Sequence, residues 1–299
     1  MKKRILALWV VNYYSGSTSE RFVKPLKRLG YEVDVIPLES KTVDMELVLN
    51  APKYDLLLHL PYPNTVRPEI IKSLPIKTIA WNGDDEWFWQ KFPKFSKQIA
   101  KSHDFCITTF EPALKNYGNG ILASWGHSSD WKPKKVKKDI DVYFCGAKTD
   151  ERDIYLEQLK QYGIKAEVDG PGYSRKIPLR NMIDKYRRAK IGLSFLMGKK
   201  DRYYYQVKAR TFEIPAVGTF QLSEGSPELA RLFNDNEIKI FWNEGELIKK
   251  IEYYLKHDDE REKIAKAGHE KNKQYSYEKI FKRCFKEIKK KSVLGVDSK

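Results

Sequence analysis

The residues with the clearest chemical potential stand in segment 208–220, which reads Lys-Ala-Arg-Thr-Phe-Glu-Ile-Pro-Ala-Val-Gly-Thr-Phe. Lys208 and Arg210 supply cations suited to a diphosphate, and the carboxylate of Glu213 can accept two hydrogen bonds from a ribose diol. We expect a helix over 207–212, which puts these three side chains at its end, beside the start of a strand. A helix with solvated charges and a Pro/Gly turn is the alternative interpretation.

Two more loops carry cations directly after predicted strands. Gly146, Lys148 and Arg152 follow one strand and open a helix. The run Lys-Lys-Asp-Arg-Tyr-Tyr-Tyr, which contains Arg202 and Tyr205, follows another strand and interleaves cations with aromatic rings. An aromatic ring there can stack on a base while the cations meet phosphates. Each loop alone is compatible with a solvated surface, but together they favour phosphate binding.

Backbone groups at several turns are further binding candidates. Gly16 follows the first strand and Gly172 follows a later one, while Gly218 and Thr219 lead into the strand after the Lys/Arg/Glu cluster. Exposed N–H groups at such turns can approach a phosphate or a sugar. Neither GxGxxG nor GxxxxGK[ST] occurs in the chain, which disfavours dinucleotide-binding and P-loop enzymes.

An acidic run, Asn-Gly-Asp-Asp-Glu-Trp, follows the predicted strand 78–81. Crowded carboxylates resist simultaneous ionisation, which can raise the pKa of one of them toward the value that a general base needs. Asp84 or Asp85 is therefore our candidate to orient or deprotonate an acceptor hydroxyl. The same acids suit the first turn of the following helix equally well. No histidine with ligand spacing accompanies them, so we expect no metal site.

Two of the five histidines are weaker candidates. His127 lies near the predicted hinge, and His59 ends a predicted strand. A histidine of the surface or the core is the stronger interpretation of each.

Short apolar runs alternate with amphipathic stretches, a pattern typical of parallel sheets covered by helices. The charged segment 130–139 contains a proline and separates two such regions. We therefore expect an α/β protein with two doubly wound Rossmann-like domains, residues 1–136 and 137–299, facing across a cleft. Ligands of such sheets lie beyond the carboxyl ends of the strands. The expected strands are 5–11, 31–36, 54–60, 78–81, 105–110, 140–145, 165–168, 191–196, 219–222 and 238–242, and the expected helices include 19–29, 150–162, 244–256 and 276–290.

The composition is that of a globular protein with a large positive charge. The chain has 299 residues, of which 41% are hydrophobic, and a formal net charge of +16. Residues 1–138 alone hold 22 Lys and Arg against 14 Asp and Glu. Such a field attracts nucleic acid, an anionic membrane surface or phosphorylated ligands without choosing between them, and a solvated lysine-rich face is the alternative. No apolar run approaches the roughly 18 residues of a membrane span. We expect a cytoplasmic protein, at most peripheral to a membrane.

These features resemble the CgeB-like (spore maturation protein) glycosyltransferases, relatives of the group 1 glycosyltransferases with the two-Rossmann GT-B fold. The likeness is dense over about residues 139–290 and thin over the first half. The matching pieces are Lys208-x-Arg-x-Phe-Glu213, Pro215-Ala-Val-Gly218, Pro227-Glu-Leu-x-x-x-Phe233, Asp141-Val-Tyr-Phe-Cys-Gly146, the run 247–267 and Asp84-Asp85.

The resemblance implies a metal-independent enzyme that moves a sugar from a nucleotide-sugar donor, UDP- or GDP-linked, to an acceptor hydroxyl. It implies that the second domain holds the donor, that the first binds the acceptor, and that the last helix, about 276–290, packs back on the first domain. Glu213 corresponds to the later glutamate of the family's Glu-x7-Glu pair, which grips the ribose. Tyr205 takes the place of the earlier one, so the stereochemical outcome stays open.

Two rival functions remain open at this stage. One is a glycosyltransferase acting on DNA, with the basic first domain as its duplex platform; lipids and glycans are the other acceptor classes. The second is a protein that binds a nucleotide sugar or a glycan without catalysis, which the missing earlier glutamate suggests.

Overall fold

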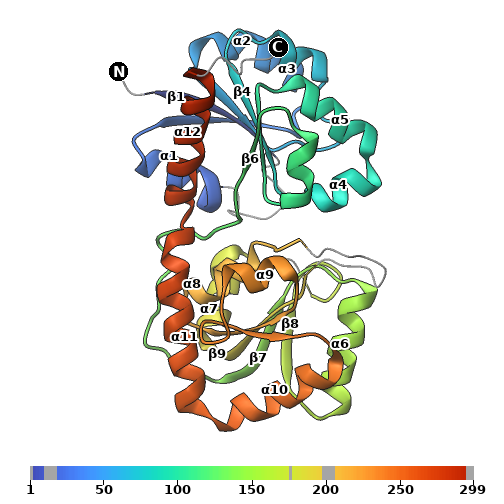
Figure 1. Ribbon diagram of the computed structural model, residues 1–299, viewed down its shortest axis with the longest axis vertical. Coiled ribbons are helices and arrows are strands. Elements are labelled where there is room, and N and C mark those ends of the chain that lie inside the picture. The colour runs from blue at the N-terminus through green and yellow to red at the C-terminus, as the bar shows by residue number, and fades with distance from the viewer. Residues whose placement is uncertain (1–2, 10–18, 175–176, 197–205, 294–299) are drawn as a thin grey trace. The chain divides into compact units, whose positions relative to one another are not determined.

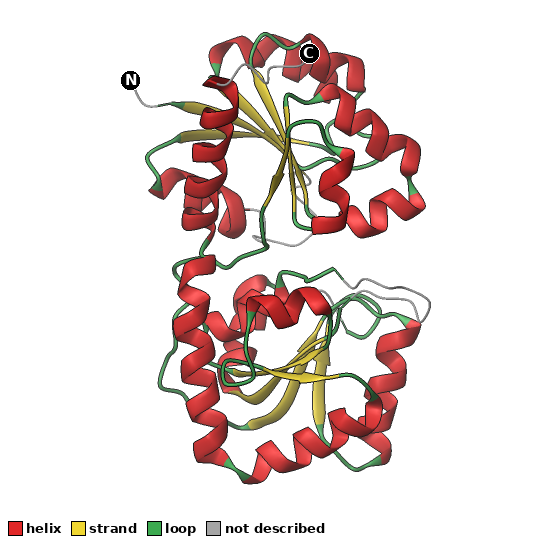
Figure 2. Ribbon diagram, viewed as in Figure 1, coloured by secondary structure: helices red, strands yellow, loops and turns green. Residues whose placement is uncertain are grey.

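A computed structural model describes residues 3–9, 19–174, 177–196 and 206–293 of the chain. The chain divides into two compact units. The first unit comprises Met1–Ser128 and Tyr277–Lys299, and the second unit comprises Ser129–Ser276. Each unit is an α/β structure with one parallel sheet, as Figures 1 and 2 show.

The sheet of the first unit has six parallel strands in the order β2-β1-β3-β4-β5-β6. The strands are β1 (Arg4–Trp9), β2 (Glu32–Pro37), β3 (Leu56–His59), β4 (Lys77–Asn82), β5 (Phe105–Thr108) and β6 (Gly120–Leu122). The helices are η1 (Ser19–Val23), α1 (Lys24–Arg28), α2 (Val43–Asn50), η2 (Ala51–Lys53), α3 (Pro68–Ser73), α4 (Asp85–Lys91), α5 (Pro93–Ser102), η3 (Glu111–Asn116) and α12 (Tyr277–Val293).

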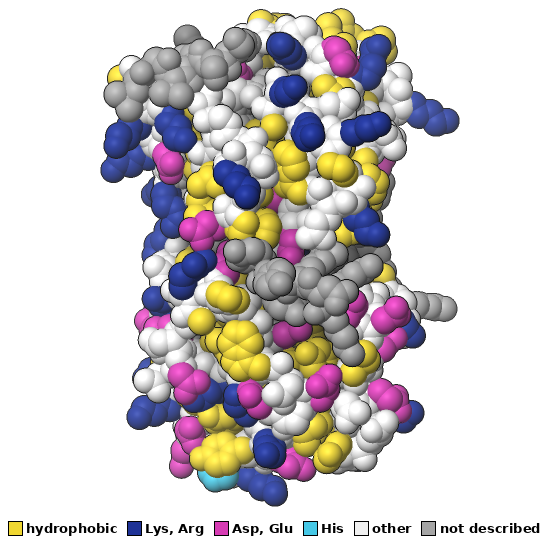
Figure 3. Space-filling model, turned by 45° about the vertical axis from the view of Figure 1, so that its right-hand side comes forward, with side chains coloured by type: hydrophobic (Ala, Val, Ile, Leu, Met, Phe, Trp, Pro, Cys, Tyr) yellow, Lys and Arg dark blue, Asp and Glu magenta, His cyan; other side chains and the backbone are white. Residues whose placement is uncertain are grey.

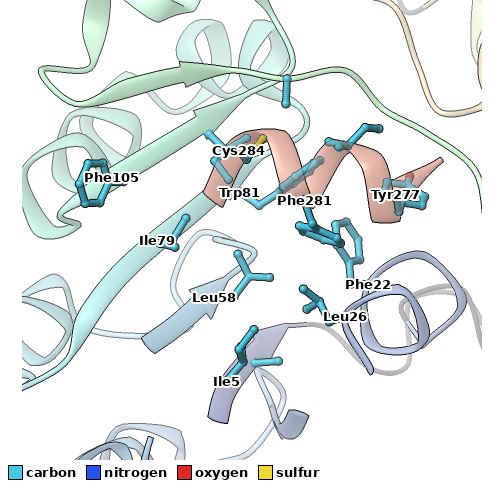
Figure 4. Packing of buried hydrophobic residues seen from close by; sticks show 14 of the residues in the cluster. Ile5, Phe22, Leu26, Leu58, Ile79, Trp81, Phe105, Tyr277, Phe281 and Cys284 are labelled. Atoms are coloured by element: carbon cyan, nitrogen blue, oxygen red, sulfur yellow. The ribbon is translucent and has the colours of Figure 1, made fainter. Parts of the chain in front are cut away.

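Alternate residues of these strands face two separate cores, because side chains of a strand point in turn to opposite faces. Along β1, Ile5 joins the core beneath α1 and α12, whereas Leu6 joins the core beneath α2 and α3. Figure 4 shows Phe22 of η1 and Phe281 of α12 pointing toward the strand residues of the first of these cores. The sheet is thus covered on both faces, as a doubly wound sheet must be.

The helix α12 belongs to the first unit although it lies at the C-terminal end of the chain. Tyr277, Ile280, Phe281 and Cys284 are fully buried in the same core as the first strand. Their spacing repeats every three or four residues, so one stripe of the helix is apolar. The backbone carbonyl of His127 accepts a hydrogen bond of 3.0 Å from the backbone N–H of Tyr277, where the chain returns to this unit.

The sheet of the second unit has five parallel strands in the order β11-β10-β9-β7-β8. The strands are β7 (Ile140–Cys145), β8 (Ala166–Asp169), β9 (Ala189–Ser194), β10 (Phe220–Glu224) and β11 (Lys239–Phe241). The helices are α6 (Asp150–Gln161), α7 (Leu179–Arg188), α8 (Arg210–Ala216), α9 (Pro227–Leu232), α10 (Glu244–Lys256), α11 (Asp258–Asn272) and η4 (Lys273–Tyr275).

The charged segment 130–139 packs on the second unit. Trp131 is 7% exposed and contributes to the core beneath α7 and α8. The guanidinium of Arg187 donates two hydrogen bonds, of 3.2 and 3.1 Å, to the backbone carbonyl of Lys132. The second unit therefore begins at Ser129, earlier than residue 136, where the sequence placed the boundary.

All ten expected strands are present among the described residues, with their ends shifted by at most two residues, except that residues 10 and 11 lie outside that part of the chain. The short strand β6 was not expected from the sequence. In the part of the chain that the structure describes, no helix has the length and apolar character needed to cross a bilayer.

Candidate phosphate-binding site of the second unit

The strand order of the second unit locates a candidate site. In chain order β7 is the first strand, and β8 lies on one side of it while β9 lies on the other. The connections therefore leave β7 and β9 in opposite directions, which opens a crevice beyond their carboxyl ends. The loop Gly146–Thr149 follows β7 at this edge, and the loop that begins at Gly170 follows the neighbouring strand β8.

These two loops are interlocked through glycine. The backbone N–H of Gly146 donates to the carbonyl of Asp169 at 2.9 Å, and that of Lys148 donates to the carbonyl of Pro171 at 2.8 Å. Gly170 has φ +123°, and a Cβ atom added to it would lie 2.1 Å from the carbonyl oxygen of Gly146. Only glycine allows this approach, so the sequence fixes the paired shape of the two loops.

Arg210 and Glu213 lie at the start of a helix, and the expectation that a helix over 207–212 ends beside them was wrong. Arg210 is the first residue of α8, and its Nε donates to the carbonyl of Cys145, the last residue of β7, at 3.1 Å. Its Nη1 forms an ion pair with the carboxylate of Glu213, one turn along the helix. This arrangement places the guanidinium of Arg210 beside the carboxyl ends of β7 and β9, where the chain connections leave in opposite directions.

The two partners differ in their access to solvent. The side chain of Arg210 is 18% exposed, whereas that of Glu213 is fully buried. Burial alone would lower the pKa of Arg210, but the attraction of Glu213 raises it above its ordinary value. The buried carboxylate holds the guanidinium in place, while part of the Arg210 side chain stays exposed to solvent.

The other predicted cations stand at the same edge. Lys148 is exposed and its Nζ lies 3.3 Å from a carboxylate oxygen of Asp153. Arg152 is 8% exposed, and its Nη1 donates to the carbonyl of Ala147 at 2.6 Å. The Nζ of Lys208 donates to the side-chain oxygen of Gln206 at 2.9 Å, two residues before α8 begins. Lys148, Arg152, Lys208 and Arg210 thus all stand at the edge formed by the carboxyl ends of the parallel strands.

Glu224, which the sequence analysis missed, is the last residue of β10 at this edge. Its Oε2 accepts a hydrogen bond of 2.8 Å from the backbone N–H of Leu196, just past the end of β9. Burial raises the pKa of Glu224 to about 7, against partial opposition from the Leu196 N–H, Arg152 and Tyr155. The sequence carries only one signal for Glu224: an acidic residue at the end of a strand, in Leu-Ser-Glu-Gly. The same signal led to the prediction of Asp84 and Asp85.

Other predicted residues do not join this group. Gly218 and Thr219 precede β10 and so lie at the opposite edge of the sheet. Gly218 has φ +73° and packs on Pro133, while the Thr219 hydroxyl donates to the carbonyl of Tyr186 at 2.6 Å. Both residues belong to the turn between α8 and β10. Residues that precede a parallel strand lie away from its carboxyl end, so Gly218 and Thr219 support the fold and do not join the candidate site. Of the remaining candidates, Gly172 lies in the loop after β8 with φ +88°, and Gly16, Arg202 and Tyr205 lie outside the described residues.

In the first unit, the acidic run occupies the end of β4 and the start of α4. Asp85 is 1% exposed, and one of its carboxylate oxygens accepts a hydrogen bond of 2.6 Å from the hydroxyl of Tyr117. Burial, together with this carboxylate, raises the pKa of Tyr117 above its ordinary value. The structure thus makes Asp85 a buried acceptor, which does not suit it to act on a substrate, and leaves Asp84 as the more exposed of the two.

The predicted histidines are both buried. The Nδ1 of His59 lies 3.0 Å from the Nε2 of His103, and the two rings stack with centroids 5.2 Å apart. Burial lowers the pKa of both groups, that of His103 to about 4. His127 is 6% exposed, and its Nδ1 donates to the carbonyl of Ser128 at 3.0 Å. Packing therefore accounts for each of them.

Within the described residues, no group of three or more His, Cys, Asp or Glu side chains is arranged to hold a metal ion. The cations of the second unit are the groups available to neutralise a phosphate there.

Comparison with known proteins gives a family likeness for the second unit and a shared fold. Residues 152–285 match the model of a family described as "Glycosyl transferase-like". This match begins at Arg152 and includes α8 with Arg210 and Glu213. No curated protein sequence matches the chain significantly.

Solved structures share the fold over nearly the whole chain. Sucrose-phosphate synthase from Thermosynechococcus elongatus is 12% identical, with a TM-score of 0.66, over 98% of this chain and 100% of that one. Anabaena HepE in complex with UDP-glucose is 9% identical, with a TM-score of 0.67, over 96% and 99%. An α-glucosyltransferase in complex with UDP and a 13-mer DNA is 12% identical, with a TM-score of 0.65, over 97% and 100%. The expected fold class, α/β of GT-B type with two Rossmann-like domains, is confirmed.

Proposed function

We propose that this protein is a glycosyltransferase that moves a sugar from a nucleotide-diphosphate donor to an acceptor hydroxyl. The observation that carries the proposal is the group of Lys148, Arg152, Lys208 and Arg210 at the carboxyl edge of the second sheet. The match of residues 152–285 to a glycosyltransferase-like family supports it, as does the fold shared with proteins that bind UDP-sugars. The resemblance to CgeB-like proteins remains our finer assignment.

In the proposed reaction, the cations stabilise the negative charge that develops on the departing nucleotide diphosphate. Electrostatic stabilisation of a leaving group by preorganised donors is commonly the largest catalytic contribution, and it needs no metal ion here. The partly exposed guanidinium of Arg210 is held by Glu213 and by the carbonyl of Cys145, so it is preorganised. Lys148 and Lys208 add mobile positive charge around it.

In this proposal, the main role of Glu213 is to hold the guanidinium of Arg210 in place. The family resemblance gives it the ribose as a partner, but the carboxylate has no exposed surface in this structure. We therefore assign the ribose contact as a second role, which requires local opening around the start of α8. Asp84, which precedes α4 at its N-cap position, is our candidate to orient the acceptor hydroxyl, with inversion at the anomeric carbon as the corresponding outcome.

A panel of UDP- and GDP-sugars tests the donor site. A ligand that binds only the folded protein raises its stability, by about 2.7 kcal/mol at a hundred times its Kd. We expect at least one donor to raise the melting temperature, and Lys148→Ala to weaken its binding about tenfold. Lys160→Ala, an exposed lysine in the last turn of α6, serves as the matched control. Failure of every donor to bind would contradict the proposal, and tight binding without transfer to any acceptor would indicate a non-catalytic binding protein.

For the acceptor, we propose nucleic acid bound by the outer face of α12. Seven of the seventeen residues of this helix are Lys or Arg, and two are acids. The exposed cations recur every three or four residues along the helix: Lys279, Lys282, Lys286 and Lys289. They span about 15 Å at 1.5 Å per residue, a length over which a duplex presents several phosphates.

The neighbouring helix α1 adds to this surface. Lys27 and Arg28 of α1 are exposed, and Arg28 is tied to Glu278 of α12 by an ion pair of 2.9 Å. Figure 3 brings forward the right-hand side of the view in Figure 1, and Lys and Arg side chains are spread over the first unit on that face too. The apolar stripe of α12 is already buried in the core, so the helix has no second face to insert into a bilayer. That favours nucleic acid over a membrane surface, which binds amphipathic helices through an exposed apolar face.

Salt dependence tests the acceptor. Binding of duplex DNA should weaken steeply with salt, and log K should fall with log salt by about 0.9 for each phosphate contact. The triple variant Lys282→Ala, Lys286→Ala, Lys289→Ala should lower this slope, by up to about 3. Lys256→Ala, Lys263→Ala, Lys266→Ala, on exposed positions of α10 and α11, should not. Equal slopes for the two variants would contradict the proposal, and transfer to a lipid or glycan with no DNA binding would assign another acceptor.

A further inference from the structure

Glu224 connects three elements of the proposed donor site. It ends β10, its Oε2 accepts from the backbone N–H of Leu196 at 2.8 Å, and its Oε1 accepts from the hydroxyl of Tyr155 at 3.4 Å. Leu196 follows β9 and Tyr155 belongs to α6. One carboxylate therefore ties the exit of β9 and the helix α6 to the end of β10.

Further contacts of α6 reach Phe195, next to the end of β9, and the loop after β7. The ring of Tyr155 stacks on Phe195, with centroids 5.2 Å apart and planes 3° apart. Arg152 lies one turn earlier on α6, where it donates to the carbonyl of Ala147 and attracts the charge of Glu224. The helix α6 thus links the β7 loop, through Arg152, to Glu224 and the exit of β9, through Tyr155, along the edge where we place the diphosphate.

Among the described residues, the charged and titratable groups that act most on Glu224 belong to α6. Arg152 and the Tyr155 hydroxyl favour its charged form, and Glu151 disfavours it, while burial raises its pKa to about 7. A second negative charge nearby would favour the neutral form further, because like charges resist simultaneous ionisation. A neutral Glu224 still has a carbonyl oxygen to accept from Leu196, so the contact to β9 does not depend on the charge.

We propose that Glu224 is a positioning residue of the donor site, which ties α6, the helix that carries Arg152, to the exit of β9 and takes up a proton when a diphosphate binds beside them. This inference rests on the proposed function. The proton comes from the solvent, so binding consumes up to one proton for each donor bound, and less where Glu224 is already partly protonated. Affinity should therefore fall as pH rises through about 7, by no more than tenfold for each pH unit, since a single group titrates.

Calorimetry with UDP-glucose as the probe measures this proton directly. Both phosphates of UDP-glucose are esterified, so the ligand itself does not titrate near pH 7. We expect the binding enthalpy of the wild-type protein at pH 7.5 to change between buffers of different ionisation enthalpy, as proton uptake requires. Glu224→Gln should abolish that dependence and flatten the pH profile, whereas Glu252→Gln, on an exposed position of α10, should behave as wild type.

Hydrogen exchange of the Leu196 amide gives a second readout that needs no ligand. Glu224→Ala should lower its protection, and Glu224→Gln, which keeps an acceptor oxygen, should largely retain it. Binding by the wild type without proton uptake, or uptake that persists in Glu224→Gln, would overturn the inference and leave the proposed function standing. If the wild type binds neither UDP-glucose nor any other nucleotide sugar, the proposed function fails and this role fails with it.

Discussion

Replacing Arg210 with alanine is expected to lower sugar transfer by about 100- to 1000-fold, the usual cost of removing one preorganised donor from a site of developing charge. The same change should lower stability, because it leaves the fully buried carboxylate of Glu213 without its guanidinium. Breaking a buried ion pair in this way costs about 3–5 kcal/mol. For a unit of this size, that corresponds to a fall in melting temperature of roughly 10 °C or more.

A double variant separates the two effects. In Arg210→Met with Glu213→Gln the buried charge is gone, and replacing a buried ion pair with neutral groups is often nearly neutral for stability. We expect this protein to regain most of its thermal stability while donor binding and transfer stay low, since the cation at the β7 edge is still missing. Recovery of transfer together with stability would show that Arg210 acts only in folding.

Arg210→Lys refines the same prediction. Lysine keeps the positive charge but cannot donate at once to the carbonyl of Cys145 and to Glu213 with one planar group. We expect intermediate activity, measured as a lower kcat with a smaller change in KM. Activity equal to wild type would mean that charge alone matters at this position.

Much of the fold follows from local pattern. The strand β7 and the helix α10 occupy the residue ranges that the sequence predicts, because β7 is a short, nearly continuous apolar run and α10 keeps a helical period throughout. The helix α8 differs because it contains Pro215, which sequence rules place at or beyond a helix end. The strand β6 has only three residues, too few for an alternating pattern to stand out.

The site was predictable only in part, because charge is visible in a sequence and burial is not. Lys148 and Arg152 were proposed from their place after a strand, and Lys208 and Arg210 from their place at the end of an expected helix, beside the start of a strand. Asp85 was proposed to meet a substrate, but Tyr117, 32 residues later, buries its carboxylate. Glu224 was missed because its environment comes from Leu196 and Tyr155, which lie 28 and 69 residues away in the chain.

The interlocked loops after β7 and β8 give the second large prediction. Gly170→Ala should destabilise the second unit by about 3–5 kcal/mol and abolish donor binding. Two costs add: a side chain at φ +123° strains the backbone, and its Cβ would overlap the carbonyl of Gly146 at 2.1 Å. The neighbour is backbone, so no rotamer change relieves the overlap, and the β7 loop must move.

Gly163→Ala is the matched control, because it strains the backbone in the same way but causes no steric overlap of the added Cβ. Gly163 also has a positive φ, +69°, but an added Cβ there meets nothing within 4 Å. We expect this variant to lose only about 1–2 kcal/mol and to bind the donor as the wild type does. Melting temperature and donor affinity are measured for both variants. If Gly170→Ala bound the donor normally, the paired loops would not shape the site, and the phosphate would have to lie elsewhere on the second unit.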